Sequence, residues 1–301
     1  MLTVVIPSYN HEDYVVDSLR AALAIDVAGC KILVIDDGST DNTVGKVNDY
    51  VQKHDAGARV TVISKANGGL VSSLNLALQM IETEFFWIVA SDDVLVPAGV
   101  QALHQRISSN PGLGFIMGGG HYVYDDGRRS PVYKKQHQAF FDLPAEQRGQ
   151  NIFTDYPSPL LLQSSIFRTE AIRAIGGWDP ALKWDDYPIF VKLLQRHRTR
   201  GVDFEFLPEI DCVDYRQHGE NTYRNVYGQF AMVQQALQAL APPAVRTRAI
   251  GNALAFYALV ALKNGNRAFF KRAYQSSSAP VLLRAALSLP VVASKYVLTK
   301  L

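Results

Sequence analysis

The chain has 301 residues, of which 48% are hydrophobic and 19% charged, with a formal net charge of +2. These proportions are typical of a soluble globular protein and exclude collagen-like and disordered classes. With only Cys30 and Cys212 present, a disulfide framework is excluded and a reducing, cytoplasmic compartment is favoured. No basic stretch precedes the first apolar segment, so we expect no secretory signal.

The first 125 residues alternate between two hydrophobic patterns. Short apolar, β-branched runs predict strands at residues 2–7, 31–35, 60–64 and 85–89. Between them, apolar residues at helical spacing predict helices, including one over residues 70–81. This alternation is typical of an α/β protein with a mostly parallel, doubly wound sheet.

The middle of the chain, about residues 110–225, is more irregular and rich in aromatic residues. We expect strands at residues 113–117 and 122–124, separated by a glycine turn at 118–120. Residues 130–160 are predicted to form a long loop region, of the kind that often carries function.

From residue 226 the pattern is helical almost throughout, so we expect two domains, residues 1–225 and 226–301. Breaks in the helical pattern are predicted at Pro242-Pro243, residues 264–266, residues 276–278 and Pro290. Residues 281–299 come closest to a transmembrane span, but two bases and a proline interrupt them. An interfacial or packed helix is therefore expected there.

The second domain is strongly basic. Residues 226–301 contain 9 Lys+Arg and no Asp or Glu, whereas residues 1–225 contain 21 Lys+Arg and 28 Asp+Glu. A basic, apolar segment of this kind suggests an anionic membrane surface or another polyanion as a neighbour. The alternative is that these helices pack on the first domain or form a homodimer interface, where their bases offset the acidic body.

Polar loops follow three of the predicted strands, at residues 7–10, 36–39 and 91–93. In an open parallel sheet, ligands bind beyond the carboxyl ends of the strands, so these loops are expected to meet at one edge. No glycine-rich phosphate loop follows the first strand. A divalent cation held by acidic side chains is therefore the expected means of neutralising a phosphate ligand.

Several sequence blocks, in order, resemble the signature of family 2 glycosyltransferases with the GT-A fold. The blocks are VVIPSYN at 4–10, VIDDGSTD at 34–41, NGG at 67–69 followed by Asn75, SDD at 91–93, GGWD at 176–179, Asp185-Asp186 and YRQHGEN at 215–221. The resemblance covers about residues 1–225. It implies an inverting transfer of a sugar from a nucleotide-diphosphate donor to a hydroxyl of a glycan or lipid-linked acceptor. The cofactor would be Mn²⁺ or Mg²⁺, and the reaction would belong to cell-surface polysaccharide synthesis. No nucleic acid is expected as a partner.

The resemblance also assigns residues to the donor. It places Pro7, Tyr9, Asp37 and Asn67 at the nucleotide, with Tyr9 against the base and Asp37 accepting a hydrogen bond from it. Asp92 would bind the ribose and so completes the nucleotide-binding set. Asp93 would bind the metal that bridges the diphosphate, with His218 as a further candidate metal ligand. From the residues alone, Tyr9 could instead be a core tyrosine and 92–93 a solvated turn, while Asp36 and Asp41 suit a turn and a helix cap.

On the catalytic side, the resemblance makes Asp186 the general base that takes the proton of the acceptor hydroxyl. Asp185 would cap the following helix or contact the acceptor. Trp178 and Trp184 would stack on an acceptor sugar, burial in the core being the alternative for each. His218 is a candidate metal ligand, or else a structural or acceptor-side histidine.

Two positions depart from the family pattern. Ala90 stands where many relatives carry a further acid, and Leu74 where an arginine is frequent. The first leaves fewer carboxylates for the metal, and the second removes a contact to the donor.

Two other functions remain open on the sequence. A sugar-1-phosphate nucleotidyltransferase would need a glycine-rich, basic loop after the first strand, which residues 7–10 do not supply. A non-catalytic sugar-nucleotide binding protein would not need Asp92, Asp93 and Asp186 together. The preferred prediction is a cytoplasmic enzyme held peripherally at the inner face of a membrane by its basic helices.

Overall fold

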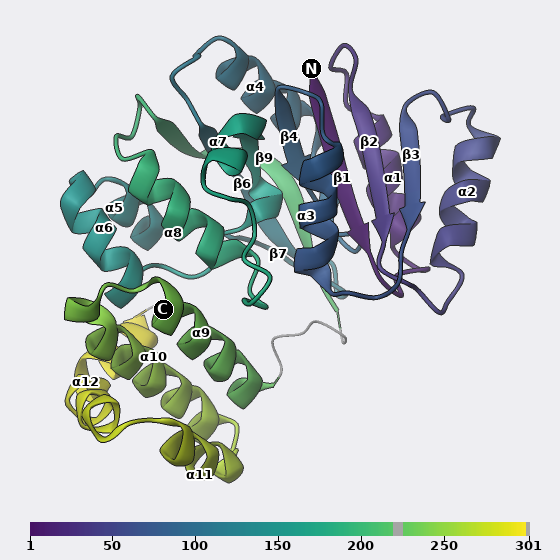
Figure 1. Cartoon of the computed structure of the whole chain (residues 1–301). Helices are drawn as coiled ribbons and strands as arrows, with labels where there is room; N and C mark the ends of the chain where they lie inside the picture. The colour runs from purple at the N-terminus through teal and green to yellow at the C-terminus, as the bar shows by residue number, and fades with distance from the viewer. Residues whose placement is uncertain (219–224, 299–301) are drawn as a thin grey trace. The chain divides into compact units, whose positions relative to one another are not determined.

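A computed structural model describes residues 1–218 and 225–298 of the chain (Figure 1). The chain divides into two compact units. The sheet unit comprises Met1–Ala145 and Pro157–His218, and the helical unit comprises Glu146–Tyr156 and Gly219–Leu301. Residues 146–156 thus group with the C-terminal helices, although the sequence assigned them to the first domain.

The sheet unit is built on one sheet with the strand order β3-β2-β1-β4-β8-β6-β9-β5. The first four strands are parallel, and β8 lies antiparallel between β4 and β6. The strands are β1 Leu2–Ser8, β2 Lys31–Asp36, β3 Val60–Ser64, β4 Phe85–Ile88, β5 Val94–Leu95, β6 Phe115–Tyr124, β7 Arg129–Pro131, β8 Ser165–Arg168 and β9 Phe204–Gln217. The predicted α/β class and the parallel arrangement of the first half are confirmed.

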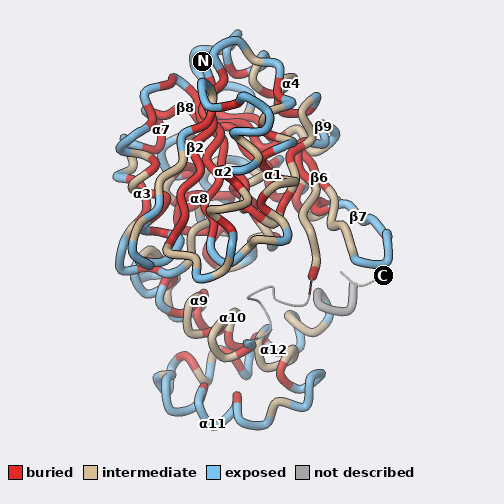
Figure 2. The backbone as a smooth tube through the Cα atoms, turned by 90° about the vertical axis from the view of Figure 1, so that its right-hand side faces the viewer, coloured by how far each residue is buried: buried red, intermediate tan, exposed pale blue. Residues whose placement is uncertain are grey.

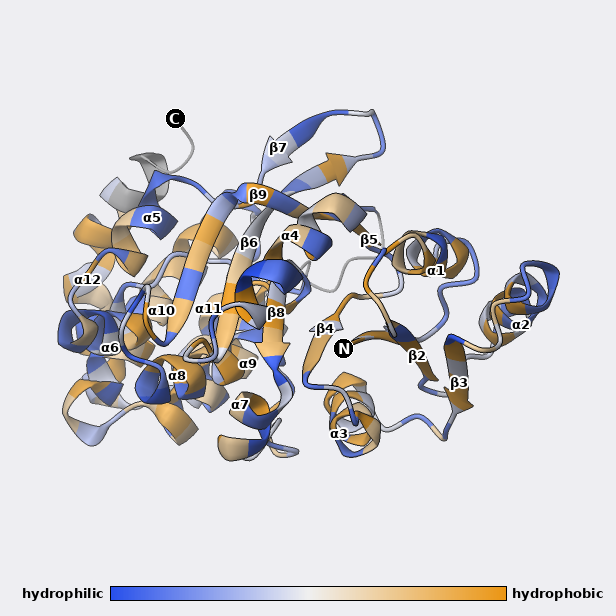
Figure 3. Cartoon of the chain, turned by 90° about the horizontal axis from the view of Figure 1, so that it is seen from above, coloured by the Kyte–Doolittle hydropathy of each residue, from blue (hydrophilic) through white to orange (hydrophobic). Residues whose placement is uncertain are grey.

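Helices cover both faces of this sheet. They are α1 Val15–Leu23, α2 Thr43–Lys53, α3 Leu70–Met80, α4 Pro97–Ser108, α5 Lys135–Phe141, α7 Thr169–Ala174 and α8 Asp186–Arg196. Figure 3 shows α1 and α2 on one side of the parallel strands and α3 on the other. Every residue of β1 is therefore buried, which is why the strand is apolar on both faces. Figure 2 shows buried backbone gathered in the interior of the sheet unit.

The core under α1 forms because its apolar side chains recur at helical spacing. Val15, Leu19 and Ala22 are fully buried and belong to one cluster with Val4 and Ile32 of the sheet. Burying a side chain of this size stabilises the fold by roughly 1.5–3 kcal/mol. The helical stripe of α1 and the continuous apolar run of β1 thus pack into a single core.

The predicted glycine turn at residues 118–120 is wrong, because β6 runs through it without a break. The glycines are needed for the close approach of β9. A Cβ atom on Gly119 would lie 2.1 Å from the carbonyl oxygen of Pro208, and one on Gly120 would lie 2.4 Å from that of Val213. The ladder between β6 and β9 shifts register at this point, as a β-bulge does.

The predicted loop at residues 130–160 is also wrong, since α5 and α6 (Ala145–Thr154) occupy much of it. His137, Phe140 and Phe141 of α5 are buried. These helices are short, so their apolar residues do not repeat often enough to give a clear helical period. Tertiary packing stabilises such short helices.

The helical unit contains α6 together with α9 Val226–Leu240, α10 Pro243–Lys263, α11 Arg267–Ser276 and α12 Ala279–Leu298. Three of the predicted breaks separate these helices, but Pro290 lies inside α12. A proline removes one backbone hydrogen bond and can kink a helix rather than end it. Here α12 is held along α10, where Ser288 Oγ donates to Asn252 Oδ1 at 2.7 Å. Within the described residues, no helix combines the length and apolarity that crossing a bilayer requires.

Candidate active site

The three polar loops predicted to converge do meet at the carboxyl edge of the parallel strands. The backbone N–H of Asp37, after β2, donates to the carbonyl oxygen of Ser8 at the end of β1 (2.8 Å). The Asn10 side chain accepts a hydrogen bond from the N–H of Thr40 (2.8 Å). These contacts join the loop after β1 to the loop after β2, because parallel neighbours end at the same edge of a sheet.

Asp37 fastens the segment after β3 to this edge. Its buried carboxylate accepts hydrogen bonds from the N–H groups of Gly68 (2.9 Å) and Gly69 (2.8 Å) and pairs with Lys65. Burial favours the neutral acid, but the bonds from Lys65 and the glycines outweigh it and hold the pKa of Asp37 below its usual value. Asn67 is brought to the same place. A nucleotide base that bound to Asp37 would therefore share its carboxylate with Lys65 and the two glycine N–H groups.

The loop between β2 and α2 is closed by its own carboxylates. Asp36 accepts from the N–H groups of Gly38 (3.2 Å) and Ser39 (3.0 Å), as expected of a turn. Asp41 accepts from the N–H of Thr43 (3.0 Å) and so supports the first turn of α2, although Asn42 holds the N-cap position. The N-cap of α2 is thus Asn42, one residue after the Asp41 that the sequence favoured.

The two nucleotide-side residues after β1 differ in exposure. Pro7 is buried inside β1, where it pairs with Ile35. Tyr9 has 45% of its surface exposed, so the alternative that it is a core tyrosine is wrong. Its ring is open to a ligand at the edge of the sheet, and its contact with a base stays a prediction.

Asp93 is a fully buried carboxylate at the centre of the edge. It accepts hydrogen bonds from the backbone N–H of Arg216 (2.9 Å) and from Nε2 of Gln163 (3.2 Å). Burial, and next the charge of Asp92, raise the pKa of Asp93 well above its usual value. A solvated turn is therefore excluded at Asp93, since none of its surface is exposed.

Asp186 stands beside it at the start of α8. Its Oδ1 accepts a hydrogen bond from the N–H of Leu162 (2.9 Å). Burial raises the pKa of Asp186 well above its usual value, and the charges of Asp185 and Asp93 add to the shift. Leu162 and Gln163 are consecutive residues in the 3₁₀ turn Leu162–Ser164, so one short turn holds both carboxylates. The structure brings Asp186 and Asp93 together, although 93 positions separate them in the sequence.

Asp92 is paired with His218. His218 Nε2 lies 3.0 Å from Asp92 Oδ2, and the imidazole stacks on the ring of Tyr14 with the centroids 4.8 Å apart. On the same tyrosine, the Arg216 guanidinium lies 5.2 Å from the ring centroid. The end of β9 is thus fixed over the loop that precedes α1.

Sequence reasoning missed Tyr14 and His11 in this loop. His11 Nδ1 lies 2.7 Å from Ser91 Oγ, and its ring meets that of His218 edge-on at 6.4 Å. Their signal was their place in the sequence, since both follow the block VVIPSYN within five positions of Tyr9. Both rings contact the imidazole of His218, and His11 also contacts Ser91, which directly precedes Asp92.

On the acceptor side, Trp178 is buried with 3% of its surface exposed. Its indole is therefore not available to stack on a sugar in this structure, and the alternative of burial holds. Trp184 is half-buried and stacks on Tyr187 with the centroids 4.6 Å apart. Asp185 occupies the N-cap position of α8 without a side-chain capping bond, which leaves an acceptor contact as its predicted role.

The two departures from the family pattern have different surroundings. Leu74 is buried in α3 with 1% of its surface exposed, so this position points into the core rather than toward a donor. Ala90 directly precedes the buried Ser91, and its carbonyl oxygen accepts from Asp93 N–H at 3.0 Å.

The carboxylates suit a divalent cation with few protein ligands. Among the described residues, no three His, Cys, Asp or Glu side chains lie close enough to form a metal cage. Mg²⁺ commonly binds through one or two carboxylates and completes its shell with water and substrate phosphates. The buried carboxylate of Asp93, beside the partly buried Asp92, fits that pattern. A cation there would neutralise charge that burial makes costly.

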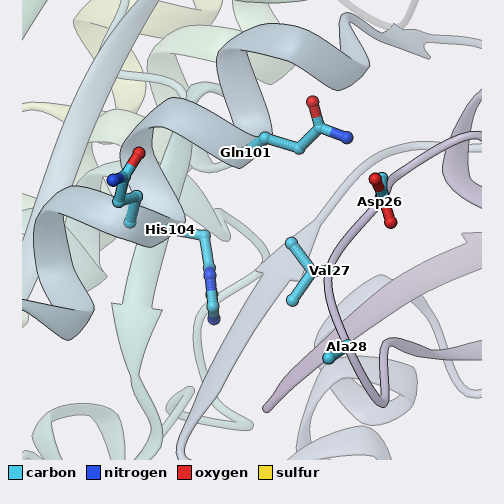
Figure 4. A pocket seen from close by; sticks show the side chains of 6 residues that line it. Asp26, Val27, Ala28, Gln101 and His104 are labelled. Atoms are coloured by element: carbon cyan, nitrogen blue, oxygen red, sulfur yellow. The ribbon is translucent and has the colours of Figure 1, made fainter.

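A separate pocket of about 380 Å³ lies near the amino end of β2 (Figure 4). It is lined by Asp26, Val27, Ala28, Gln101, His104 and Gln105. None of these residues belongs to the edge that carries Asp37, Asp93 and Asp186, so this pocket is distinct from the candidate active site.

Known proteins resemble this chain over its sheet unit and beyond. The profile of "Glycosyl transferase family 2" matches residues 3–170. The chain is 30% identical over 127 residues to Glycosyltransferase GlyG of Streptococcus pneumoniae serotype 4, covering 42% of this chain and 40% of that protein. It is 28% identical over 246 residues to the Hyaluronan synthase of Pasteurella multocida, covering 79% of this chain and 23% of that protein. The chain thus spans less than half the length of either relative.

Solved structures share the fold at low sequence identity. S. aureus TarS 1–349 in complex with UDP-GlcNAc superposes with a TM-score of 0.59 at 20% identity, covering 84% of this chain and 71% of that one. The mannosyltransferase PcManGT from Pyrobaculum calidifontis, in complex with GDP-Man and Mn²⁺, gives 0.59 at 18% identity, covering 96% and 80%. With the profile match over more than half of its length, the chain belongs to glycosyl transferase family 2.

Proposed function

We propose that this protein is an inverting glycosyltransferase that uses a nucleotide-diphosphate sugar and a divalent cation. The observation that carries the proposal is the pair Asp93 and Asp186, a buried and a partly buried carboxylate held by one turn at the carboxyl edge of the sheet. Paired acids with raised pKa values at such an edge are typical of a catalytic centre rather than a structural one.

Asp186 is the proposed general base. As the acceptor hydroxyl attacks the anomeric carbon, its proton passes to the Asp186 carboxylate, the new glycosidic bond forms, and the bond from that carbon to the diphosphate oxygen breaks. A carboxylate with a raised pKa accepts a proton more readily than an ordinary one. The N–H of Leu162 fixes its orientation, which helps because a base must be placed before it can act.

The donor would lie across the ends of β1, β2 and β4. Tyr9 offers an exposed ring to the base, and Asp37 and Asn67 stand at the neighbouring loop. Asp93, with His218, would hold Mn²⁺ or Mg²⁺, and Asp92 would bind the ribose of the donor. When bound, the cation stabilises the negative charge that develops on the leaving diphosphate. TarS and PcManGT were each solved with a nucleotide sugar, which supports this class of donor.

The acceptor is proposed to be a hydroxyl of a glycan or a lipid-linked sugar, as in the synthesis of a surface polysaccharide. The name of one relative, a hyaluronan synthase, supports a polysaccharide. The basic residues of 226–301, unopposed by any acid, support work beside an anionic membrane at its cytoplasmic face.

A donor screen tests the proposal. The purified protein is incubated with UDP-, GDP- and dTDP-sugars in Mn²⁺, and binding and slow hydrolysis of each donor are measured. We expect one nucleotide to bind in a metal-dependent manner and its sugar to be released. Absence of binding for every nucleotide sugar would overturn the proposed function.

A further inference from the structure

One side of α11 presents two aromatic and two basic side chains together. Tyr274 has 71% of its surface exposed and Phe270 39%, while Arg267 and Lys271 are exposed as well. At 3.6 residues per turn, these four positions fall within about 100° of the helix circumference. We call Arg267, Phe270, Lys271 and Tyr274 the α11 strip.

The opposite side of α11 anchors the helix in its unit. Phe269 and Ala273 are buried, and the ring of Phe269 packs against that of Phe230 with centroids 5.9 Å apart. Asn266 Oδ1 accepts the N–H of Phe269 at 3.2 Å, capping the first turn. At the other end, Gln234 Nε2 donates to the carbonyl oxygen of Ser276 at 3.1 Å. The helix is thus anchored by residues outside the strip; of the strip aromatics, Phe270 meets the ring of Phe269 edge-on at 5.6 Å.

The surroundings of the α11 strip are both basic and apolar. The preceding helix, α10, ends at the exposed Lys263, and the residue before it, Leu262, is 61% exposed. No acidic residue occurs anywhere in 226–301, and the acids in the described part of the unit, Glu146 and Asp155, belong to the segment 146–156. Two copies meeting through this strip would bring like charges together, which disfavours self-association.

A lipid bilayer matches this combination better than a purely polar polyanion. Helices that lie in a membrane interface carry aromatic residues on the buried side and Lys or Arg toward the headgroups. Aromatic rings are favoured at the headgroup level, and bases are attracted to anionic lipids. A polar polyanion would satisfy the bases but would leave the exposed Phe270 and Leu262 without an apolar partner.

We propose that the α11 strip docks the helical unit on an anionic lipid surface, with Phe270 and Tyr274 entering the interface and Arg267 and Lys271 facing anionic headgroups. The inference rests on the proposed function only in that a lipid-linked acceptor would give this docking its use.

Vesicle co-sedimentation of the full-length protein tests the docking. Vesicles of phosphatidylcholine alone are compared with vesicles that also contain phosphatidylglycerol, and donor hydrolysis is measured on the same preparations. We expect binding to the anionic vesicles and a loss of binding as salt is raised. Arg267→Gln with Lys271→Gln should weaken binding by about 25-fold, at about fivefold for each base. Phe270→Ser with Tyr274→Ser should weaken it by about tenfold or more.

Leu283→Ser is the matched control, because Leu283 is an apolar side chain on α12 that is 64% exposed. It should bind vesicles as the unaltered protein does. Tyr274→Trp gives a readout that needs no loss of function, since its fluorescence should shift to the blue with anionic vesicles and not with neutral ones.

Equal binding to neutral and anionic vesicles would overturn the proposal, as would an equal loss in the Leu283→Ser control. A change of sedimentation coefficient in the strip variants without vesicles would show that the strip binds a second copy instead. Unaltered donor hydrolysis alongside any of these results would leave the glycosyltransferase proposal standing, so the two can fail separately.

Discussion

Asn75 of α3 and Trp178 are joined by a two-way hydrogen bond between residues 103 positions apart. Asn75 Nδ2 donates to the carbonyl oxygen of Trp178 at 2.8 Å, and the Trp178 N–H donates to Asn75 Oδ1 at 3.1 Å. The amide of Asn75 thus pairs with both backbone polar groups of Trp178, as a neighbouring strand would, in the loop that leads to α8. Lys192 Nζ binds the adjacent Gly177 carbonyl oxygen (3.0 Å), so the loop before Asp186 is fixed from both sides.

Asn75→Ala should therefore act on the catalytic side rather than on the donor. It leaves the buried N–H and carbonyl of Trp178 without partners, which should lower the free energy of unfolding by about 1–3 kcal/mol. We expect kcat to fall while donor affinity is kept, as measured by urea unfolding, calorimetry and turnover. Asn75→Asp keeps the acceptor for the Trp178 N–H but sets a second acceptor against the Trp178 carbonyl oxygen, so it should not restore the loss. A donor affinity that falls as steeply as kcat would contradict this placement.

Asp93→Ala should abolish metal-dependent binding of the nucleotide diphosphate and leave the sheet unit folded. Asp93 is a fully buried carboxylate of the site. Burial and the charge of Asp92 raise its pKa, and the nearby charge of Arg216 offsets this only in part. Calorimetry of a nucleoside diphosphate with and without Mn²⁺ measures the effect. The exposed Asp125 provides a control, since Asp125→Ala should change neither titration. Undiminished metal-dependent binding in Asp93→Ala would remove Asp93 from the metal site.

Asp186→Asn should keep nearly normal donor affinity and lower the transfer rate by about 10²–10⁴, as expected for the loss of a general base. In the unaltered enzyme, kcat/KM should fall as the pH is lowered through the pKa of Asp186, because only the carboxylate accepts a proton. That pKa is raised by burial and by Asp185, so the acid limb should lie above the ordinary carboxylate range. A variant that loses donor binding but keeps its turnover number would show that the roles are reversed.

His218→Ala separates two roles for this side chain. As a metal ligand, His218 predicts a raised Mn²⁺ requirement, whereas an acceptor role predicts a change in acceptor KM alone. Tyr14 stacks on His218, so Tyr14→Ala should shift the same parameter by a smaller factor, and Tyr14→Phe should retain the ring and restore it. Metal titrations of turnover measure the three variants. If Tyr14→Ala leaves that parameter unchanged, the stacking does not position His218.

Stability should fall on mild acidification because His137 is buried in α5. Burial lowers the pKa of His137 to about 4 from its ordinary value of 6.5. Between these values the unfolded chain binds the proton and the folded chain does not, so the free energy of unfolding decreases as the pH falls. From pH 7 to pH 5 the loss from His137 is roughly 2 kcal/mol.

Urea unfolding at several pH values measures this dependence. His104 and His197 also have lowered pKa values through burial, so part of the slope should remain when His137 is replaced. His137→Gln should flatten the curve between pH 5 and pH 7 by its own share. An unchanged slope in that variant would place the proton-sensitive group elsewhere.

The sequence by itself determined the parallel half of the sheet and the location of the site at its carboxyl edge. Both follow from local patterns: apolar runs of strand length alternate with helical stripes, and polar loops close each strand. Since parallel neighbours end at the same edge, the meeting of the loops that contain Asp37 and Asp93 follows from topology alone. The order of the blocks also identified the family that the profile over residues 3–170 confirms.

Only the tertiary structure decided which motif residues hold the fold together instead of facing a ligand. Trp178 carries a motif position but is buried, and Asn75 of the donor-side block holds the Trp178 backbone. In the same way, Gly119 avoids a clash with Pro208 of β9 rather than forming a turn. Each outcome depends on a neighbour about 90 or more positions away. Local propensity and spacing cannot show such a neighbour, because these contacts form only when distant segments pack against one another.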